Sequence, residues 1–155
     1  MEATITNTAV ITANVVTPIT VRETINAEEQ SLLTITKSVS PVPVTENGTL
    51  TYTFVIQNLG NTAATEETGV VITDTFNPVL KNLTATFNGT AWTEGADYTY
   101  DEITGMFASV AGKITVPAAT YTQDTTTGAW GINPGVSTLG ISWTALTEIV
   151  TAAIP

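Results

Sequence analysis

The sequence contains no cysteine and no histidine among its 155 residues. Without cysteine there is no disulfide and no thiolate nucleophile, and without histidine the commonest general base is missing. The usual zinc ligands are absent for the same reason. The sequence also has no glycine-rich phosphate loop, nucleophile elbow or dinucleotide-binding fingerprint. We therefore predict that the protein is not an enzyme and that it holds no cofactor and no metal.

Positive charge is also scarce, because 14 acidic residues against 4 basic ones give a formal net charge of −10. Nucleic acids and anionic lipid surfaces are bound by clustered lysines and arginines. The basic residues here are scattered along the chain: Arg22, Lys37, Lys81 and Lys113. No apolar run reaches the length of about 18 residues that suggests a membrane helix, and no signal peptide is visible. We expect neither nucleic-acid binding nor membrane insertion.

Threonine is the residue present in excess, with 34 copies. Its β-branched side chain fits a pleated sheet better than a helix. Apolar and polar residues alternate with a period of two along most of the chain, which indicates strands. The clearest predicted strands are Leu32–Val39, Thr49–Gln57, Val70–Phe76, Leu83–Phe87, Asp97–Tyr100, Lys113–Val116 and Val136–Ala145. We predict an all-β fold, a β-sandwich with Greek-key connections.

A short internal repeat links residues 98–107 to residues 121–130. Each copy contains an aromatic strand, a turn that starts with Asp and ends with Gly, and an aromatic residue on the return strand. This pattern predicts two similar hairpins, and Asn88-Gly89 predicts a third, tight hairpin turn. The alternative is a calcium site, which requires the two turns to meet in space. Its candidate ligands are Asp97, Asp101, Glu102 and Asp124.

Four ordered segments carry a resemblance to a known family. They are Leu33–Pro41 (LTITKSVSP), Gly48–Asn61 (GTLTYTFVIQNLGN), Val70–Phe76 (VVITDTF) and Pro134–Leu139 (PGVSTL). Through them, residues 31–145 resemble the conserved repeats of bacterial and archaeal surface proteins known as the eleventh domain of unknown function. The resemblance implies an immunoglobulin-like sandwich without catalytic activity. It also implies an extracellular location, on a cell or spore surface.

The chain departs from this family at its closing strand. Family repeats end with a strand that reads roughly Ile-Thr-Asn-Thr-Ala, whereas residues 144–155 contain no asparagine. That pattern occurs instead at the N-terminus, in Ile5–Ile11. The displaced strand can complete its own sandwich, can fill a gap in a neighbouring copy, or can be an ordinary additional strand. If each copy donates its strand to the next, the contact repeats without forming a closed ring, and the copies build an open filament.

From this departure we predict an N-terminal donor strand (residues 1–16), a polar linker (17–30) and an immunoglobulin-like body (31–155). The donor face consists of alternate residues, and the acceptor edge comes from the last body strand. The predicted interface is Ala3, Ile5, Asn7, Ala9, Ile11, Ala13 and Val15 against Leu139, Ile141 and Trp143. The predicted function is a structural filament subunit whose only partner is a second copy, joined head to tail.

The alternative function is a cell-surface adhesin or carbohydrate-binding module with a self-complemented sandwich. Trp92 and Trp130 are the candidates to stack on sugars, unless they pack within their own hairpins. Trp143 alternates with Leu139 and Ile141, which predicts a place in the core.

Three polar residues occupy positions where the alternation calls for apolar ones: Lys37, Asp74 and Asn7. Burial favours the neutral forms of an amine and of a carboxylic acid. A neutral lysine amine can attack an asparagine side chain while a protonated aspartate polarises the carbonyl. These residues resemble the lysine, aspartate and asparagine sets that form isopeptide bonds in Gram-positive surface proteins. The alternative is a buried Lys37–Asp74 ion pair with Asn7 as a hydrogen-bond partner or a near-surface residue.

Overall fold

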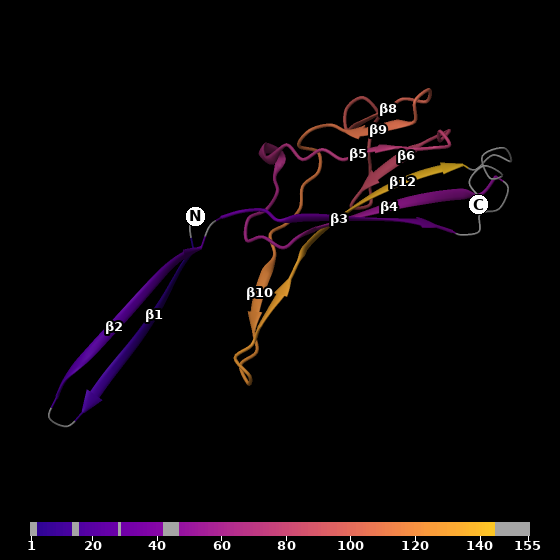
Figure 1. The fold of residues 1–155 in the computed structure, drawn as a ribbon. Coiled ribbons are helices and arrows are strands. Elements are labelled where there is room, and N and C mark those ends of the chain that lie inside the picture. The colour runs from indigo at the N-terminus through magenta and orange to yellow at the C-terminus, as the bar shows by residue number, and fades with distance from the viewer. Residues whose placement is uncertain (1–2, 14–15, 28, 42–46, 145–155) are drawn as a thin grey trace. The chain divides into compact units, whose positions relative to one another are not determined.

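The computed structural model describes residues 3–13, 16–27, 29–41 and 47–144. The chain forms two compact units, Met1–Gln30 and Ser31–Pro155. The described regular structure is almost entirely antiparallel β-sheet (Figure 1), which confirms the all-β class.

The N-terminal unit is a hairpin of two long strands, β1 (Ala3–Ala13) and β2 (Val16–Ala27), paired in antiparallel. The prediction of a polar linker over residues 17–30 was therefore wrong for most of that segment. Its threonines and charged residues alternate with β-branched apolar residues, which suits a strand. The apolar members of this alternation are Ile19, Val21 and Ile25.

The C-terminal unit contains two sheets and a separate ribbon. The five-stranded sheet has the order β3 (Leu33–Ser40), β4 (Thr49–Asn58), β12 (Gly135–Thr144), β6 (Thr84–Phe87) and β7 (Thr90–Ala91). The three-stranded sheet has the order β5 (Thr73–Thr75), β9 (Met106–Ser109) and β8 (Tyr98–Tyr100). The ribbon pairs β10 (Thr120–Gln123) with β11 (Trp130–Asn133), and one 3-10 turn spans Glu66–Thr68.

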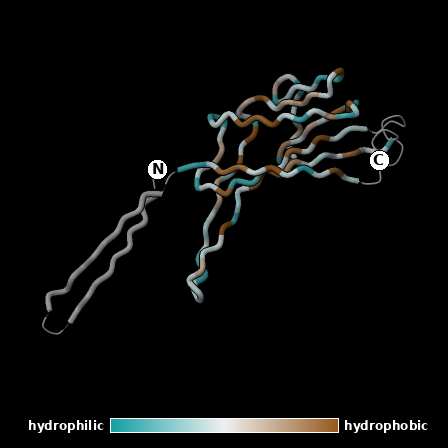
Figure 2. Tube along the Cα trace, in the orientation of Figure 1, coloured by the Kyte–Doolittle hydropathy of each residue, from teal (hydrophilic) through white to brown (hydrophobic). Residues whose placement is uncertain are grey.

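The two sheets share one hydrophobic core, which gives the unit a sandwich-like arrangement. Strand β12 contributes Leu139, Ile141 and Trp143, all nearly inaccessible to solvent. From the opposite sheet and its flanks come Phe107, Tyr98 and other buried residues. Figure 2 shows the resulting alternation of hydrophobic and hydrophilic residues along the strands. The core prediction for Trp143 is confirmed.

The internal repeat forms two hairpins with the same turn, as predicted. In β8–β9 the Asp101 carboxylate accepts hydrogen bonds from the backbone N–H groups of Ile103 and Thr104. Asp124 accepts the equivalent bonds from Thr126 and Thr127 in β10–β11. Each turn closes on a glycine with positive φ, +77° at Gly105 and +75° at Gly128.

The predicted turn at Asn88-Gly89 is also confirmed. It joins β6 to β7, with φ of 48° at Asn88 and 81° at Gly89. Such values favour Asn and Gly, and they match the twist of the flanking strands. Across this hairpin Phe87 and Trp92 stack with ring centroids 5.3 Å apart.

Two predicted strands differ from the structure. The segment Val70–Phe76 forms only the short strand β5, because its ladder with β9 covers just Thr73–Thr75. The segment Lys113–Val116 makes a single bridge, between Val116 and Ala64, although its apolar side chains are buried.

Candidate functional site

The two sheets of the C-terminal unit each end at an edge strand on the same side of the core. Strand β3 is the outermost member of the five-stranded sheet and pairs with β4. Strand β5 is the outermost member of the three-stranded sheet and pairs with β9. Within the described residues, neither edge has a second partner strand. Unpaired edges can accept another strand.

The inward face of β3 is left uncovered. Residues directly opposite each other in an antiparallel pair project to the same face. Ile35 lies opposite the buried Ile56, and Lys37 lies opposite the buried Phe54, so both belong to the core side of the sheet. Ile35 nevertheless remains 51% exposed, and Val39 on the same face remains 37% exposed.

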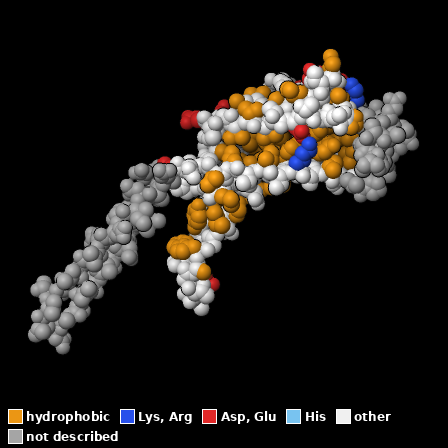
Figure 3. Space-filling model, in the orientation of Figure 1, with side chains coloured by type: hydrophobic (Ala, Val, Ile, Leu, Met, Phe, Trp, Pro, Cys, Tyr) orange, Lys and Arg blue, Asp and Glu red, His pale blue; other side chains and the backbone are white. Residues whose placement is uncertain are grey.

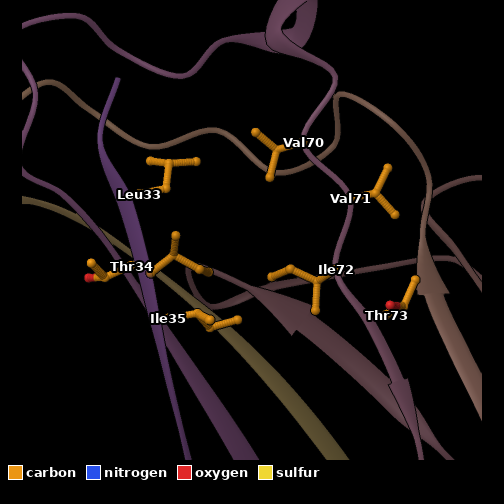
Figure 4. Close-up of a pocket in the computed structure, with 8 residues that line it drawn as sticks. Leu33, Thr34, Ile35, Val70, Val71, Ile72 and Thr73 are labelled. Atoms are coloured by element: carbon orange, nitrogen blue, oxygen red, sulfur yellow. The ribbon is translucent and has the colours of Figure 1, made fainter. Parts of the chain in front are cut away.

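A groove separates β3 from the segment that contains β5. Its larger part has a volume of about 330 Å³ and lies between Leu33 and Ile35 on one side and Val70 and Ile72 on the other (Figure 4). A second part of about 270 Å³ shares Ile35 and Ile72 and continues to Lys37. Figure 3 shows hydrophobic side chains exposed in a band between the two sheets. We call this feature the β3–β5 groove.

The free edge of β5 offers backbone hydrogen-bonding groups. The carbonyl of Ile72 accepts from Ser109 N–H, and the N–H of Phe76 donates to the Gly105 carbonyl. Alternate residues of an antiparallel strand direct their backbone groups to the same neighbour. The backbone groups of Thr73 and Thr75 therefore point away from β9, where a further strand can pair with them.

Lys37 and Asp74 meet across the groove. The Lys37 Nζ donates to Asp74 Oδ2, forming both an ion pair and a hydrogen bond between the two sheets. The same Nζ lies 4.9 Å from the ring centroid of Tyr52, 5.0 Å from that of Phe76 and 5.6 Å from that of Phe54. An ammonium at these distances is attracted by the ring faces.

The pair is less buried than the alternation suggested, because the groove above it is open. The Lys37 side chain is 41% exposed and the Asp74 side chain 19%. Both nevertheless point into the groove rather than away from the body. The structure thus brings together two of the three residues singled out for isopeptide chemistry.

The predicted acceptor edge of Leu139, Ile141 and Trp143 was wrong. Strand β12 pairs with β4 along its whole length and with β6 over Leu139–Ser142, so it lies inside the sheet. Alternation in a sequence identifies the inward face of a strand, but it does not give the order of strands. The edge strands β3 and β5 could be found only from the pairing itself.

The predicted donor residues lie in the N-terminal unit. The backbone of β1 places Asn7 opposite Glu23 and Ile5 opposite Ile25. Its predicted donor face is Ala3, Ile5, Asn7, Ala9, Ile11 and Ala13. The side chains of β1, and Val15 altogether, lie outside the described residues.

The calcium alternative receives no support from the turns. In the described part of the chain, no three Asp, Glu, His or Cys residues come close enough to hold a metal. The carboxylate of Asp101 is already used by its turn. Hydrogen bonds from the backbone of Ile103 and then of Thr104 hold the pKa of Asp101 below its usual value.

The two candidate sugar-stacking tryptophans differ in their surroundings. Trp92 packs against Phe87 within its hairpin. Trp130 is 69% exposed on the β10–β11 ribbon, where it lies opposite Gln123. Trp130 is therefore not packed in its hairpin as Trp92 is.

Comparisons with protein-family models, with curated proteins and with solved structures found no match to the chain. Among the described residues, no helix has the length and apolar character needed to cross a membrane. The geometry of the β3–β5 groove is therefore the main basis for a functional proposal.

Proposed function

We propose that the protein is a structural subunit of an extracellular filament on a cell or spore surface. Copies join head to tail by donor-strand exchange, with β1 of one copy in the β3–β5 groove of the next. The observation that carries this proposal is the exposed inward face of β3 beside the edge of β5, which has no partner strand among the described residues. The body is then an immunoglobulin-like Greek-key sandwich that lacks one strand, in keeping with the displaced N-terminal strand.

The composition of β1 suits this groove. Its eleven residues exceed the eight of β3, and alternate positions carry Ile5, Asn7 and Ile11. Full burial of an isoleucine side chain contributes about 1.5–3 kcal/mol. Part of this gain offsets the loss of conformational freedom on binding. Because donor and acceptor are different surfaces, the contact repeats without closing and forms an open chain.

The same arrangement places Asn7 where it can react with Lys37. In this proposal the neutral Lys37 Nζ attacks Cγ of Asn7, and Asp74 donates a hydrogen bond to the side-chain oxygen. The C–N bond to the amide nitrogen breaks, and that nitrogen leaves as ammonia with a proton that Nζ gives up and Asp74 passes on. An isopeptide bond then joins two subunits. A strand in the groove covers Lys37 and Asp74, and burial favours the neutral forms that this reaction needs.

Face-specific variants test the donor strand. We expect Ile5→Asp with Ile11→Asp to remove filaments seen by negative-stain microscopy, because two carboxylates would enter an apolar groove. The matched control is Thr4→Asp with Thr8→Asp, which adds the same charge to the opposite face of β1 and should leave filaments intact. Full-length filaments from the isoleucine variant would contradict donor-strand exchange.

Mass spectrometry of boiled, detergent-treated filaments tests the covalent bond. We expect a ladder of multimers in which each junction is lighter by one ammonia. Asn7→Ala, Lys37→Ala and Asp74→Ala should each abolish the ladder. Clean, unmodified monomer from the wild type would show that Lys37 and Asp74 form only an ion pair.

A second candidate function rests on the exposed aromatic residues of the ribbon. Trp130 and Tyr121 are 69% and 50% exposed. Aromatic faces of this kind can stack on sugars, as in an adhesin or a carbohydrate-binding module. Binding to a glycan array that Trp130→Ala abolishes, by a protein that never polymerises, would favour this function over the filament.

A further inference from the structure

The register of the N-terminal hairpin gives it one apolar face. Opposite residues in an antiparallel pair share a face, and alternate residues of a strand do so too. The register therefore places Ile5 and Ile25 on the same face as Ile11 and Ile19. On the other face the opposed pairs are mostly polar: Thr4 with Asn26, Thr6 with Thr24, Thr8 with Arg22, and Val10 with Thr20.

The apolar face is interrupted at its centre by one polar pair, Asn7 opposite Glu23. The β3–β5 groove also combines apolar residues with one polar pair. Apolar residues line its larger part around Ile35, and the Lys37–Asp74 pair lies in the part that continues from it. When the hairpin first docks, before any bond to Asn7 forms, Lys37 is still the charged partner of Asp74, and a carboxylate on the face that covers it complements that charge. The ammonium has three donors, of which the contact with Asp74 uses one.

We propose that the donated element is the whole β1–β2 hairpin of a second copy rather than the single strand β1. Its apolar face lies on the β3–β5 groove, and the Asn7–Glu23 pair lies over Lys37 and Asp74. This inference rests on the proposed donor-strand exchange and extends it to β2. In the proposed complex Glu23 positions the hairpin over Lys37, and the isoleucines of β2 supply part of the apolar contact with the groove.

Two physical arguments favour a hairpin over a strand. A two-stranded hairpin with one apolar face is marginally stable alone and needs a hydrophobic partner. The exposed side chains of the groove provide such a partner. A single inserted strand also leaves one of its own edges unpaired, whereas in the hairpin β2 already pairs with β1 along that edge.

Variants of β2 separate this proposal from the exchange of β1 alone. We expect Ile19→Asp with Ile25→Asp in the full-length chain to raise the critical concentration for assembly at least about 100-fold. The control, Thr20→Asp with Thr24→Asp, lies on the polar face and should change it less than about threefold. Normal assembly of the Ile19/Ile25 variant would overturn the hairpin proposal. If the Ile5/Ile11 variant also assembled normally, donor-strand exchange itself would fail.

A charge exchange tests the docking even if aspartates in β2 disrupt the hairpin. Glu23→Lys alone should weaken non-covalent assembly at least about tenfold, measured by sedimentation. Adding Lys37→Glu together with Asp74→Lys, which reverses the ion pair instead of setting two acids side by side, should restore it to within about threefold, because the opposite charges meet again. Failure to restore assembly would overturn the proposed contact. Restoration of thermal stability in a chain that remains monomeric would show that the hairpin fills its own groove, which overturns the second copy as occupant.

Discussion

Ile35→Asn is the substitution that best probes the groove, because it changes one exposed apolar side chain of β3 without adding charge near Lys37. Ile35 lies on the inward face of β3 and is 51% exposed in the free body. The asparagine amide can reach water there. In the proposed filament the donated element would cover the same position and exclude water.

The magnitude follows from this difference. About half of the isoleucine side chain remains to be buried on assembly, which corresponds to about 1–1.5 kcal/mol. Burying an amide without a partner costs about a further 1–3 kcal/mol. The sum of about 2–4.5 kcal/mol corresponds to a roughly 30- to 2,000-fold rise in critical concentration. The free energy of unfolding of the unassembled subunit should fall only by about 1–1.5 kcal/mol, because the asparagine amide still reaches water there.

The assay measures soluble protein left after sedimentation of filaments over a range of total concentrations. Ser38→Asn is the matched control, because Ser38 lies on the same strand but alternates to the outer face. We expect this control to assemble like the wild type. Equal critical concentrations for Ile35→Asn and Ser38→Asn would refute the assignment of the groove as the acceptor.

Three further predictions concern the arm and the turns. Deleting residues 1–16 should give a soluble, less stable monomer that a peptide of that sequence stabilises; an unchanged melting transition in the truncated chain would show that the body was complete. Gly105→Ala should lower the melting temperature more than Gly128→Ala. Both glycines have positive φ, but a Cβ at Gly105 would lie 2.3 Å from the Phe76 carbonyl oxygen, whereas the nearest atom at Gly128 is 4.0 Å away. Asp101→Asn should reduce the loss of stability on acidification. The backbone hydrogen bonds hold the pKa of Asp101 below 3.8, so its contribution is present above that pH and is lost as the pH falls through the folded pKa. Parallel melting temperatures of wild type and variant from about pH 5 to about pH 2 would contradict this assignment.

Local patterns in the sequence predicted the local structure well. The Asp and Gly residues of the repeat gave both hairpin turns, since these residue types suit a turn closed at positive φ. Alternation gave the inward faces of β3 and β12. It also placed Lys37 and Asp74 among apolar residues, and the structure pairs them across two sheets.

Properties that depend on strand order could not be predicted in this way. The sequence does not show that β12 lies between β4 and β6, because an edge strand and a central strand can have the same alternation. The strand β2 was missed because Thr17-Pro18 and the polar run from Ile25 to Gln30 made the segment look like a linker. Only the pairing of β2 with β1 shows that the two strands form a hairpin with one apolar face.

A helical reconstruction of the assembled filament by electron cryo-microscopy tests the central claim most directly. We predict a strand formed by residues 3–13 of one copy in the β3–β5 groove of the next, with Asn7 beside Lys37 and Asp74. A groove that is empty, or one filled by residues of the same copy, would contradict assembly by donor-strand exchange.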